Sequence, residues 1–209
     1  MVGVSWGLHF PWPMAGPQAR YGLSRVNLDA VNAPVRLAYS IDRLSKAVAV
    51  IAIWLTLICA LISAGNAGMR YAFDISSNAW LEMQWYMFGG MVLLGAPHLL
   101  TINGHIRVDL FYSRLNDRQR AWLDLAGLIF FLQPFCVYMV LVCWPWFLES
   151  WTINEISNNA GGLVRWPVKL LFPIGFGLLV LQGCSEIIKR IAALKGVIAL
   201  NTHYERPLQ

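Results

Sequence analysis

Charged side chains are scarce in this sequence of 209 residues, since only 13% are Asp, Glu, Lys or Arg while 57% are hydrophobic. A water-soluble domain usually carries about 25% charged residues, so this chain has too little charge to cover a surface in water. Its long uninterrupted apolar runs, rich in Trp and Phe, fit a bilayer better than an oversized core. The scarcity of charge therefore predicts an integral membrane protein.

The sequence also lacks the residue patterns that most active sites require. It has no C-x-x-C pair and only one histidine, His98, at the depth of an apolar run. Facing histidine pairs that would hold haem are absent, as are a Gly-rich phosphate loop, a metal triad and a nucleophile–base pair. The four cysteines fall in apolar runs and are expected to be packing residues. We therefore expect no enzyme activity, cofactor or metal, and the net charge of +5 requires no nucleic-acid partner.

Four apolar runs are long enough to cross a bilayer, which takes about 20 residues in a helix. They predict an all-α integral membrane protein with four transmembrane helices, because spanning segments must satisfy their own backbone hydrogen bonds and no alternating barrel pattern is present. The predicted spans are residues 46–65, 80–100, 122–147 and 166–186. The first apolar run begins too late for a signal peptide, so the first span is expected to be a retained anchor.

The 16 Lys and Arg residues are distributed unevenly around these spans. Five precede the first span, four lie between the second and third, four follow the last, and the other two loops hold only three. Loops rich in Lys and Arg stay in the cytoplasm, so both termini are expected to be cytoplasmic. We divide the chain into a flexible tail (1–33), a membrane domain (34–195) and a second tail (196–209).

Apolar side chains recur at helical spacing just before the first span. Leu37, Ile41 and Leu44 follow this spacing, and Arg36 lies on another face. We expect residues 34–45 to form an amphipathic interfacial helix at the inner membrane surface that leads into the span. The alternative is a plain extension of the span into the cytoplasm.

Small side chains occupy every fourth position along the first span and just beyond it. Helix association in lipid depends on close packing, which small residues permit. We therefore expect a helix–helix contact here, either within this chain or with a partner. The row consists of Ala52, Thr56, Ala60, Ala64 and Gly68.

Few polar side chains lie within the predicted spans. Glu82 stands about one turn from the outer end of the second span. A carboxylate at membrane depth often marks an ion path, but here water can reach it or Arg70 can pair with it. We expect a structural or partner-contact role for Glu82, with ion coupling as the alternative. Gln133 and Gln182 are expected to hydrogen-bond between helices, each contributing about 1 kcal/mol.

Three sequence features together resemble a known family. They are W-L-E opening the second span at residue 80, G-H-I-R-V-D after that span at residues 104–109, and the segment from residue 158 to 191. They resemble the small membrane subunit, or DctQ-like small permease, of tripartite ATP-independent periplasmic (TRAP) transporters, over about residues 34–195. The resemblance places Glu82, His105, Arg107 and Asp109 at family-pattern positions. We expect the last three to fix a helix end at the lipid headgroups, and not to bind substrate.

The resemblance implies a non-catalytic transporter subunit in the inner membrane of a bacterium. A periplasmic solute-binding protein would deliver the solute, often an organic acid, to a large membrane subunit of about twelve spans that carries the solute and sodium sites and moves like an elevator. The small subunit would scaffold that movement in the lipid bilayer and help to dock the binding protein, with an ion gradient as the source of energy. The alternative is a stand-alone four-helix membrane protein, either a redox cytochrome or a small exporter.

Overall fold

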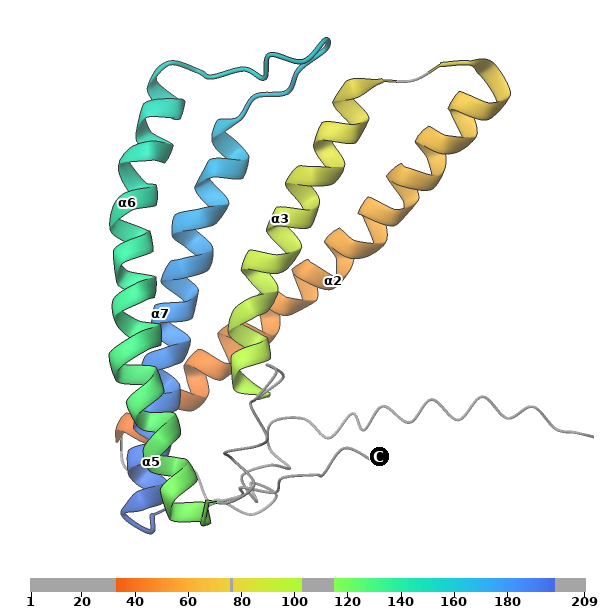
Figure 1. The fold of residues 1–209 in the computed structure, drawn as a ribbon. Helices are drawn as coiled ribbons and strands as arrows, with labels where there is room; N and C mark the ends of the chain where they lie inside the picture. The colour runs from red at the N-terminus through yellow and green to blue at the C-terminus, as the bar shows by residue number, and fades with distance from the viewer. Residues whose placement is uncertain (1–32, 76, 103–114, 198–209) are drawn as a thin grey trace, which may run out of the picture.

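The computed structural model describes residues 33–75, 77–102 and 115–197 (Figure 1). Within these ranges the chain is helical, with no strand beyond one isolated bridge between Ile156 and Val164. Figure 1 shows two pairs of helices, α2 with α3 and α6 with α7. The elements are α2 (Ala33–Phe73), α3 (Asn78–Thr101), α5 (Asp117–Gly127), the π-helical segment η3 (Leu128–Leu132), α6 (Gln133–Thr152) and α7 (Trp166–Leu194). We call the end where α2 begins and α7 ends the inner end.

Helix α2 is one continuous helix of 41 residues. It joins the predicted interfacial segment 34–45 to the predicted span 46–65 and continues past that span to Phe73. The physical reason is that nothing ends a helix at the predicted junction, because residues 35–64 contain neither proline nor glycine. The structure therefore has no separate interfacial helix in this region, and its continuity fits the alternative of an extended span.

Three of the described helices are long and apolar enough to cross a membrane: α2, the continuous helix from Arg118 to Thr152 that contains η3, and α7. Residues 47–69 of α2 carry no charged side chain, a length of about 35 Å at about 1.5 Å per residue. The hydrocarbon core of a bilayer is about 30 Å thick. Helix α3, whose outer half carries Glu82 and Gln84, is not among the three. The described part of the chain is therefore a multi-pass helical protein with three candidate spans, and a fourth span stays a prediction.

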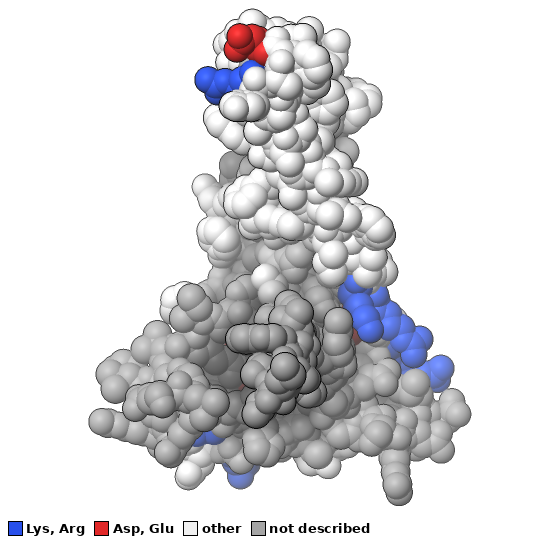
Figure 2. Space-filling view, turned by 90° about the vertical axis from the view of Figure 1, so that its right-hand side faces the viewer, with Lys and Arg blue, Asp and Glu red and all other residues white. Residues whose placement is uncertain are grey.

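The surface of the molecule also has a charge-free middle part between two charged ends. In Figure 2 a tall column without Lys, Arg, Asp or Glu lies between basic and acidic side chains at the tip and a row of basic side chains lower down. Large apolar side chains are exposed along the long helices. Trp54 of α2 is 58% exposed, Phe130 of η3 is 72% exposed and Leu141 of α6 is 67% exposed. A surface this apolar is suited to lipid, because transfer of such side chains into water is unfavourable.

Helix α7 is the central element, because it contacts α2, α3, α5, η3 and α6. Its approach to α3 depends on Gly175. A Cβ atom at this position would lie 2.8 Å from the Cβ of Leu93 and 3.1 Å from the Leu93 carbonyl oxygen. Any larger residue would push the two helices apart, so the glycine sets their separation.

The π-helical segment lies directly before Pro134. Proline has no backbone N–H and clashes with the carbonyl group four residues earlier in a regular α-helix. Here the N–H of Gln133 bonds to the carbonyl of Leu128, five residues back, and this wider turn accommodates Pro134 inside the continuous helix. The Gln133 side chain donates to the Val180 carbonyl of α7 at 3.1 Å. This confirms the predicted hydrogen bond between helices.

Candidate functional site

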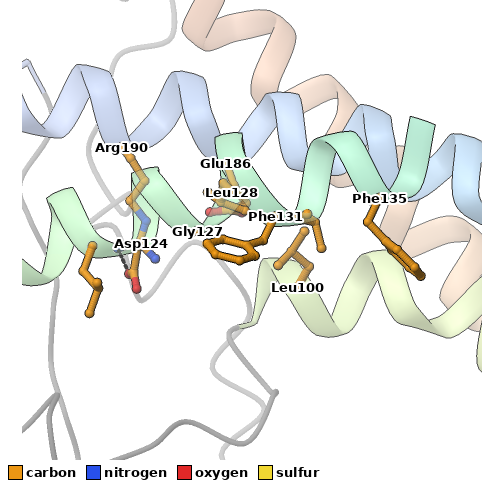
Figure 3. A pocket seen from close by; sticks show the side chains of 10 residues that line it. Leu100, Asp124, Gly127, Leu128, Phe131, Phe135, Glu186 and Arg190 are labelled. Atoms are coloured by element: carbon orange, nitrogen blue, oxygen red, sulfur yellow. Dashed lines mark ion pairs between the residues drawn. The ribbon is translucent and has the colours of Figure 1, made fainter. Parts of the chain in front are cut away.

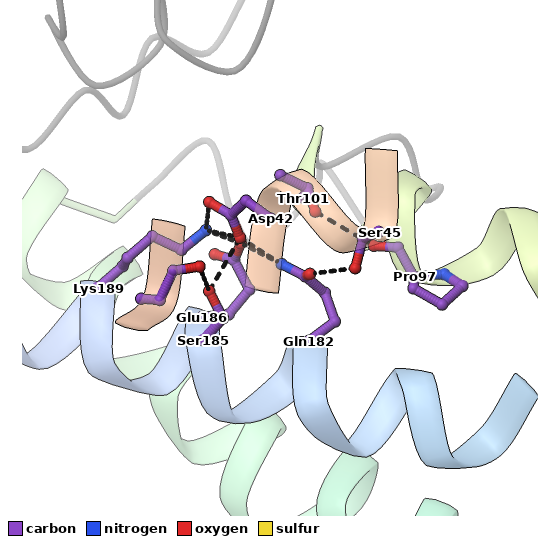
Figure 4. Close-up of polar contacts among 9 residues, drawn as sticks. Asp42, Ser45, Pro97, Thr101, Gln182, Ser185, Glu186 and Lys189 are labelled. Atoms are coloured by element: carbon purple, nitrogen blue, oxygen red, sulfur yellow. Dashed lines mark hydrogen bonds and ion pairs between the residues drawn. The ribbon is translucent and has the colours of Figure 1, made fainter. Parts of the chain in front are cut away.

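A buried group of polar side chains joins α2 to α7 near the inner end (Figure 4). We call it the inner polar cluster. Helix α7 presents four of its members at spacings of three and four residues, so they share one face of the helix. Two members from α2 are three residues apart and face them. The cluster consists of Asp42 and Ser45 of α2 and Gln182, Ser185, Glu186 and Lys189 of α7.

Lys189 lies at the centre of the inner polar cluster, with a side chain that is 0% exposed. Its Nζ is 3.0 Å from Oδ1 and 2.9 Å from Oδ2 of Asp42. It also bonds to Oε1 of Glu186, one turn earlier on the same helix. The ammonium thus lies between two carboxylates that are themselves only 8% and 3% exposed.

Gln182 and Ser185 supply further hydrogen bonds to Asp42. Gln182 Nε2 donates to Asp42 Oδ1 at 2.8 Å, while its Oε1 accepts from the Ser45 hydroxyl at 2.6 Å. The Ser185 hydroxyl is 2.9 Å from both Asp42 Oδ1 and the Ala38 carbonyl oxygen. These contacts confirm that Gln182 bonds between helices. They also lower the cost of burying a charged group, which is high unless it is both paired and hydrogen-bonded.

A second ion pair connects the same end of α7 to α5. Arg190 Nη1 lies 3.0 Å from Asp124 Oδ2, and both side chains are largely buried. The inner end of α7 is therefore held on two sides, by α2 through Asp42 and by α5 through Asp124. Removal of one member of a buried ion pair typically costs about 3–5 kcal/mol, so these contacts constrain the helices strongly.

At the outer end of the bundle, Glu82 joins α3 to the loop between α6 and α7. The residue is only 6% exposed, and its Oε2 accepts a hydrogen bond from the backbone N–H of Leu163 at 2.9 Å. Leu163 belongs to the loop between α6 and α7. This contact links α3 to that loop, so the partner that the structure gives Glu82 comes from the loop and not from Arg70.

The loop is preorganised for this contact. Residues 156 and 164 form the isolated antiparallel bridge, and the N–H of Ser157 donates to the Leu163 carbonyl at 2.9 Å. Gly162 stands where a Cβ atom would lie 2.4 Å from the Ser157 carbonyl oxygen, so only glycine fits without displacing the backbone. The narrow turn directs the Leu163 N–H toward Glu82.

Glu155 fixes the base of the same loop to α7. Its carboxylate bonds to Lys169 Nζ and lies 3.3 Å from Arg165 Nη1. These bonds, led by the one from Lys169, lower the pKa of Glu155 to about 2. Lys169 also lies 4.5 Å above the ring of Trp146, an attractive arrangement for a cation. The loop is therefore tied to α7 by charge and to α3 by Glu82.

The predicted small-residue row divides into two parts. Ala52 is buried, 3.7 Å from the place where a Cβ of Gly95 would stand. The Thr56 hydroxyl donates to the Ala52 carbonyl at 3.0 Å and lies 2.7 Å from the Met91 sulfur. The remaining three positions are exposed in this chain: Ala60, Ala64 and Gly68. A helix contact along that outer part stays a prediction.

Three predicted residues, His105, Arg107 and Asp109, lie outside the described residues. The sequence analysis in turn missed Asp42, Glu186 and Lys189, which it treated as charges of the cytoplasmic segments or left unassigned. One signal could have found the two residues of α7, because polar residues at 182, 185, 186 and 189 form a single polar stripe along one face of that helix. Within the described ranges, no group of three His, Cys, Asp or Glu side chains is placed to hold a metal ion.

Comparison with known families decides the identity of the chain. Residues 59–193 match the family described as tripartite ATP-independent periplasmic transporters, DctQ component. The chain belongs to this DctQ family. The DctQ match begins within α2 and extends through most of α7. It thus includes Glu82 and the α7 half of the inner polar cluster, whereas Asp42 and Ser45 precede it. No curated protein and no solved structure matches the chain.

Membership confirms the resemblance found in the sequence. The DctQ component is the small subunit of TRAP transporters, a transporter component that is generally non-catalytic, and it functions with a large membrane subunit and a solute-binding protein. The site described above fits a structural role for its charged groups, because each bonds to other parts of the same chain.

Proposed function

We propose that this chain scaffolds the large, elevator-type membrane subunit of a TRAP transporter and helps to dock the periplasmic solute-binding protein. The observation that carries this proposal is the connection of α7 to the other helices at both ends. Asp42 and Lys189 join α2 to α7 at the inner end, and Glu82 joins α3 to the α6–α7 loop at the outer end. A subunit held at both ends provides a fixed support against which a second protein can move.

The proposed topology has four spans in the bacterial inner membrane, with both termini in the cytoplasm. It is supported by the concentration of Lys and Arg near the inner end and by the charge-free length of α2. With this orientation, the loop between α6 and α7 lies on the periplasmic side. That loop exposes Ile153 and Ile156, 65% and 56% accessible, on a backbone held by Glu82 and Glu155. It is the part of this chain that we assign to docking.

The proposed cycle needs no chemistry from the small subunit. The solute, an organic acid by family resemblance, would bind to the two partner proteins, and an ion gradient would drive its uptake. The exposed apolar faces of α2 and α6 supply surface for lipid or for the large subunit, since association in the bilayer depends on packing of such faces.

Reconstitution tests the proposal. The chain is co-expressed with the large membrane subunit, purified, and placed in liposomes with the solute-binding protein outside and a sodium gradient across the membrane. We expect the two membrane proteins to co-purify, and we expect uptake of a labelled organic acid to require both of them, the binding protein and the gradient. Collapse of the gradient with an ionophore is the control for energy coupling. Equal uptake by the large subunit alone would refute the scaffold role.

A further inference from the structure

An open groove runs along the helix α5–η3–α6 beside α7 (Figure 3). It has a volume of about 610 Å³. Its floor and walls are apolar over most of their length, with Leu128, Phe131 and Phe135 on one side and Leu100 of α3 on the other. Asp124 and Arg190 form an ion pair at one end, and Glu186 lies beside Leu128, farther along the groove.

The dimensions of the groove correspond to one leaflet of a bilayer. The distance from Asp124 to Phe135 along the helix is about 16 Å at about 1.5 Å per residue, and half of the hydrocarbon core is about 15 Å. The charged end lies at the inner end of the bundle, and the apolar part extends toward the middle of the charge-free stretch 125–148. The groove thus matches a molecule with a polar head at the membrane surface and a chain directed inward.

The charges at the polar end restrict the kind of head group. The guanidinium of Arg190 lies 3.0 Å from the Asp124 carboxylate, while Glu186 is already paired with Lys189. A head group with one anionic and one cationic part complements the Arg190–Asp124 pair. A purely anionic head group would have to compete with Asp124 for Arg190 and would leave that carboxylate next to a second negative charge, which is unfavourable.

We propose that this groove binds a glycerophospholipid with an ethanolamine-type head group from the leaflet at the inner end. One acyl chain lies against Phe131 and Phe135, the phosphate lies near Arg190, and the ammonium donates hydrogen bonds to the Asp124 carboxylate. A choline head group has no N–H to donate, so it loses these charge-assisted bonds. The bound lipid fills the space between α3, α6 and α7 that the described side chains leave open.

Filling the groove with a side chain tests the position of the lipid. Gly127 lines the groove, and a Cβ atom there would meet nothing within 4 Å, so Gly127→Leu places its side chain in the open space. Gly89→Leu on α3 is the matched control, because a Cβ at Gly89 also meets nothing within 4 Å and this residue does not line the groove. The full-length chain, with any subunits that co-purify, is placed in nanodiscs containing equal amounts of phosphatidylethanolamine, phosphatidylcholine and phosphatidylglycerol. Retained lipid is counted by native mass spectrometry.

We expect the wild-type chain and Gly89→Leu to retain phosphatidylethanolamine in preference to the other two lipids. Gly127→Leu should lower this retention about tenfold, since it displaces about two methylene groups from the groove. Equal retention of all three lipids, or retention unchanged by Gly127→Leu, overturns the proposal. If Gly127→Leu instead abolishes co-purification of the large subunit while lipid retention is unchanged, the groove holds a protein helix and the lipid proposal is wrong.

A second variant tests the head group without filling the groove. Asp124→Asn removes the carboxylate that pairs with the lipid ammonium and leaves the Arg190 charge without that negative partner, so the preference should move from phosphatidylethanolamine toward phosphatidylglycerol. A purely structural effect would reduce retention of every lipid equally. An unchanged ratio of the two lipids in Asp124→Asn would contradict the assigned head-group contacts, even where Gly127→Leu does not fold.

Discussion

Lys189→Met tests whether the inner polar cluster holds α2 against α7. The substitution keeps a long unbranched side chain and removes the ammonium that lies about 3 Å from both oxygens of Asp42. Two buried carboxylates, Asp42 and Glu186, then lose the positive charge between them. Breaking a buried ion pair in this way typically costs about 3–5 kcal/mol. In a chain of this length that corresponds to a decrease of about 6–20 °C in the melting temperature.

The melting temperature is measured from tryptophan fluorescence of the full-length chain in detergent. Lys195→Met is the matched control, because Lys195 follows α7 and is exposed; it should melt within about 2 °C of the wild type, as surface substitutions usually do. If Lys189→Met also melts within that range, the cluster does not stabilise the fold and the reasoning is wrong.

A triple variant separates the effect of charge from the effect of shape. Asp42→Asn, Glu186→Gln and Lys189→Met together replace the ionic group by neutral residues of similar size, so no uncompensated charge is left buried. We expect the triple variant to recover most of the stability lost in Lys189→Met. Equal loss in the two variants would show that the charge left behind is not the cause.

Three further predictions concern the loop and the α3–α7 contact. Glu82→Met removes the acceptor for the Leu163 N–H, a hydrogen bond to a charged group worth about 1.5–3 kcal/mol, so hydrogen exchange at Leu163 should become roughly ten- to hundredfold faster. Gly175→Ala should destabilise the fold by about 1–3 kcal/mol through overpacking, whereas Gly177→Ala, which meets nothing within 4 Å, should leave the melting temperature unchanged. Because the pKa of Glu155 falls from 4.5 to about 2 on folding, the stability from its pairing should be complete above pH 4.5 and disappear as the pH falls toward 2, as followed by tryptophan fluorescence at low pH.

Each of these three predictions has its own control. Glu149 is exposed at the end of α6, so Glu149→Gln should not change hydrogen exchange at Leu163. Glu155→Gln cannot titrate, and the fluorescence change between pH 4.5 and 2 should be smaller in this variant than in the wild type. A Gly177→Ala variant as unstable as Gly175→Ala would show that the close contact with Leu93 is not the cause.

Local patterns in the sequence predicted most of the helices but not all of their ends. All four predicted spans lie inside observed helices, because long apolar runs without breakers favour one continuous helix. The end of α2 at Phe73 was missed, because the polar residues after position 65 suggested a loop. Backbone hydrogen bonds continue there without any need for apolar side chains, so hydropathy alone could not place the boundary.

Contacts between distant residues were harder to predict. Gln182 and Glu82 were recognised because a polar side chain in an apolar run needs a partner. No partner was named for Gln182, and the observed partner of Glu82 is the Leu163 N–H and not Arg70. Asp42 and Lys189 are 147 residues apart, and each stands among other charges near the end of an apolar run, where Lys189 served only to indicate orientation and Asp42 was left unassigned. Their pairing depends on how α2 and α7 pack, which no local pattern specifies.

The separation of Asp42 and Lys189 along the chain also has a consequence for biosynthesis. At about 5–20 residues per second, a ribosome needs roughly 7–30 s to make the chain between them. During that time α2 and α3 are already available for insertion, but the ammonium that neutralises Asp42 has not yet been synthesised. Asp42 must therefore remain in contact with water or lipid headgroups until α7 emerges, and the final packing of α2 can occur only when the last helix of the bundle is complete.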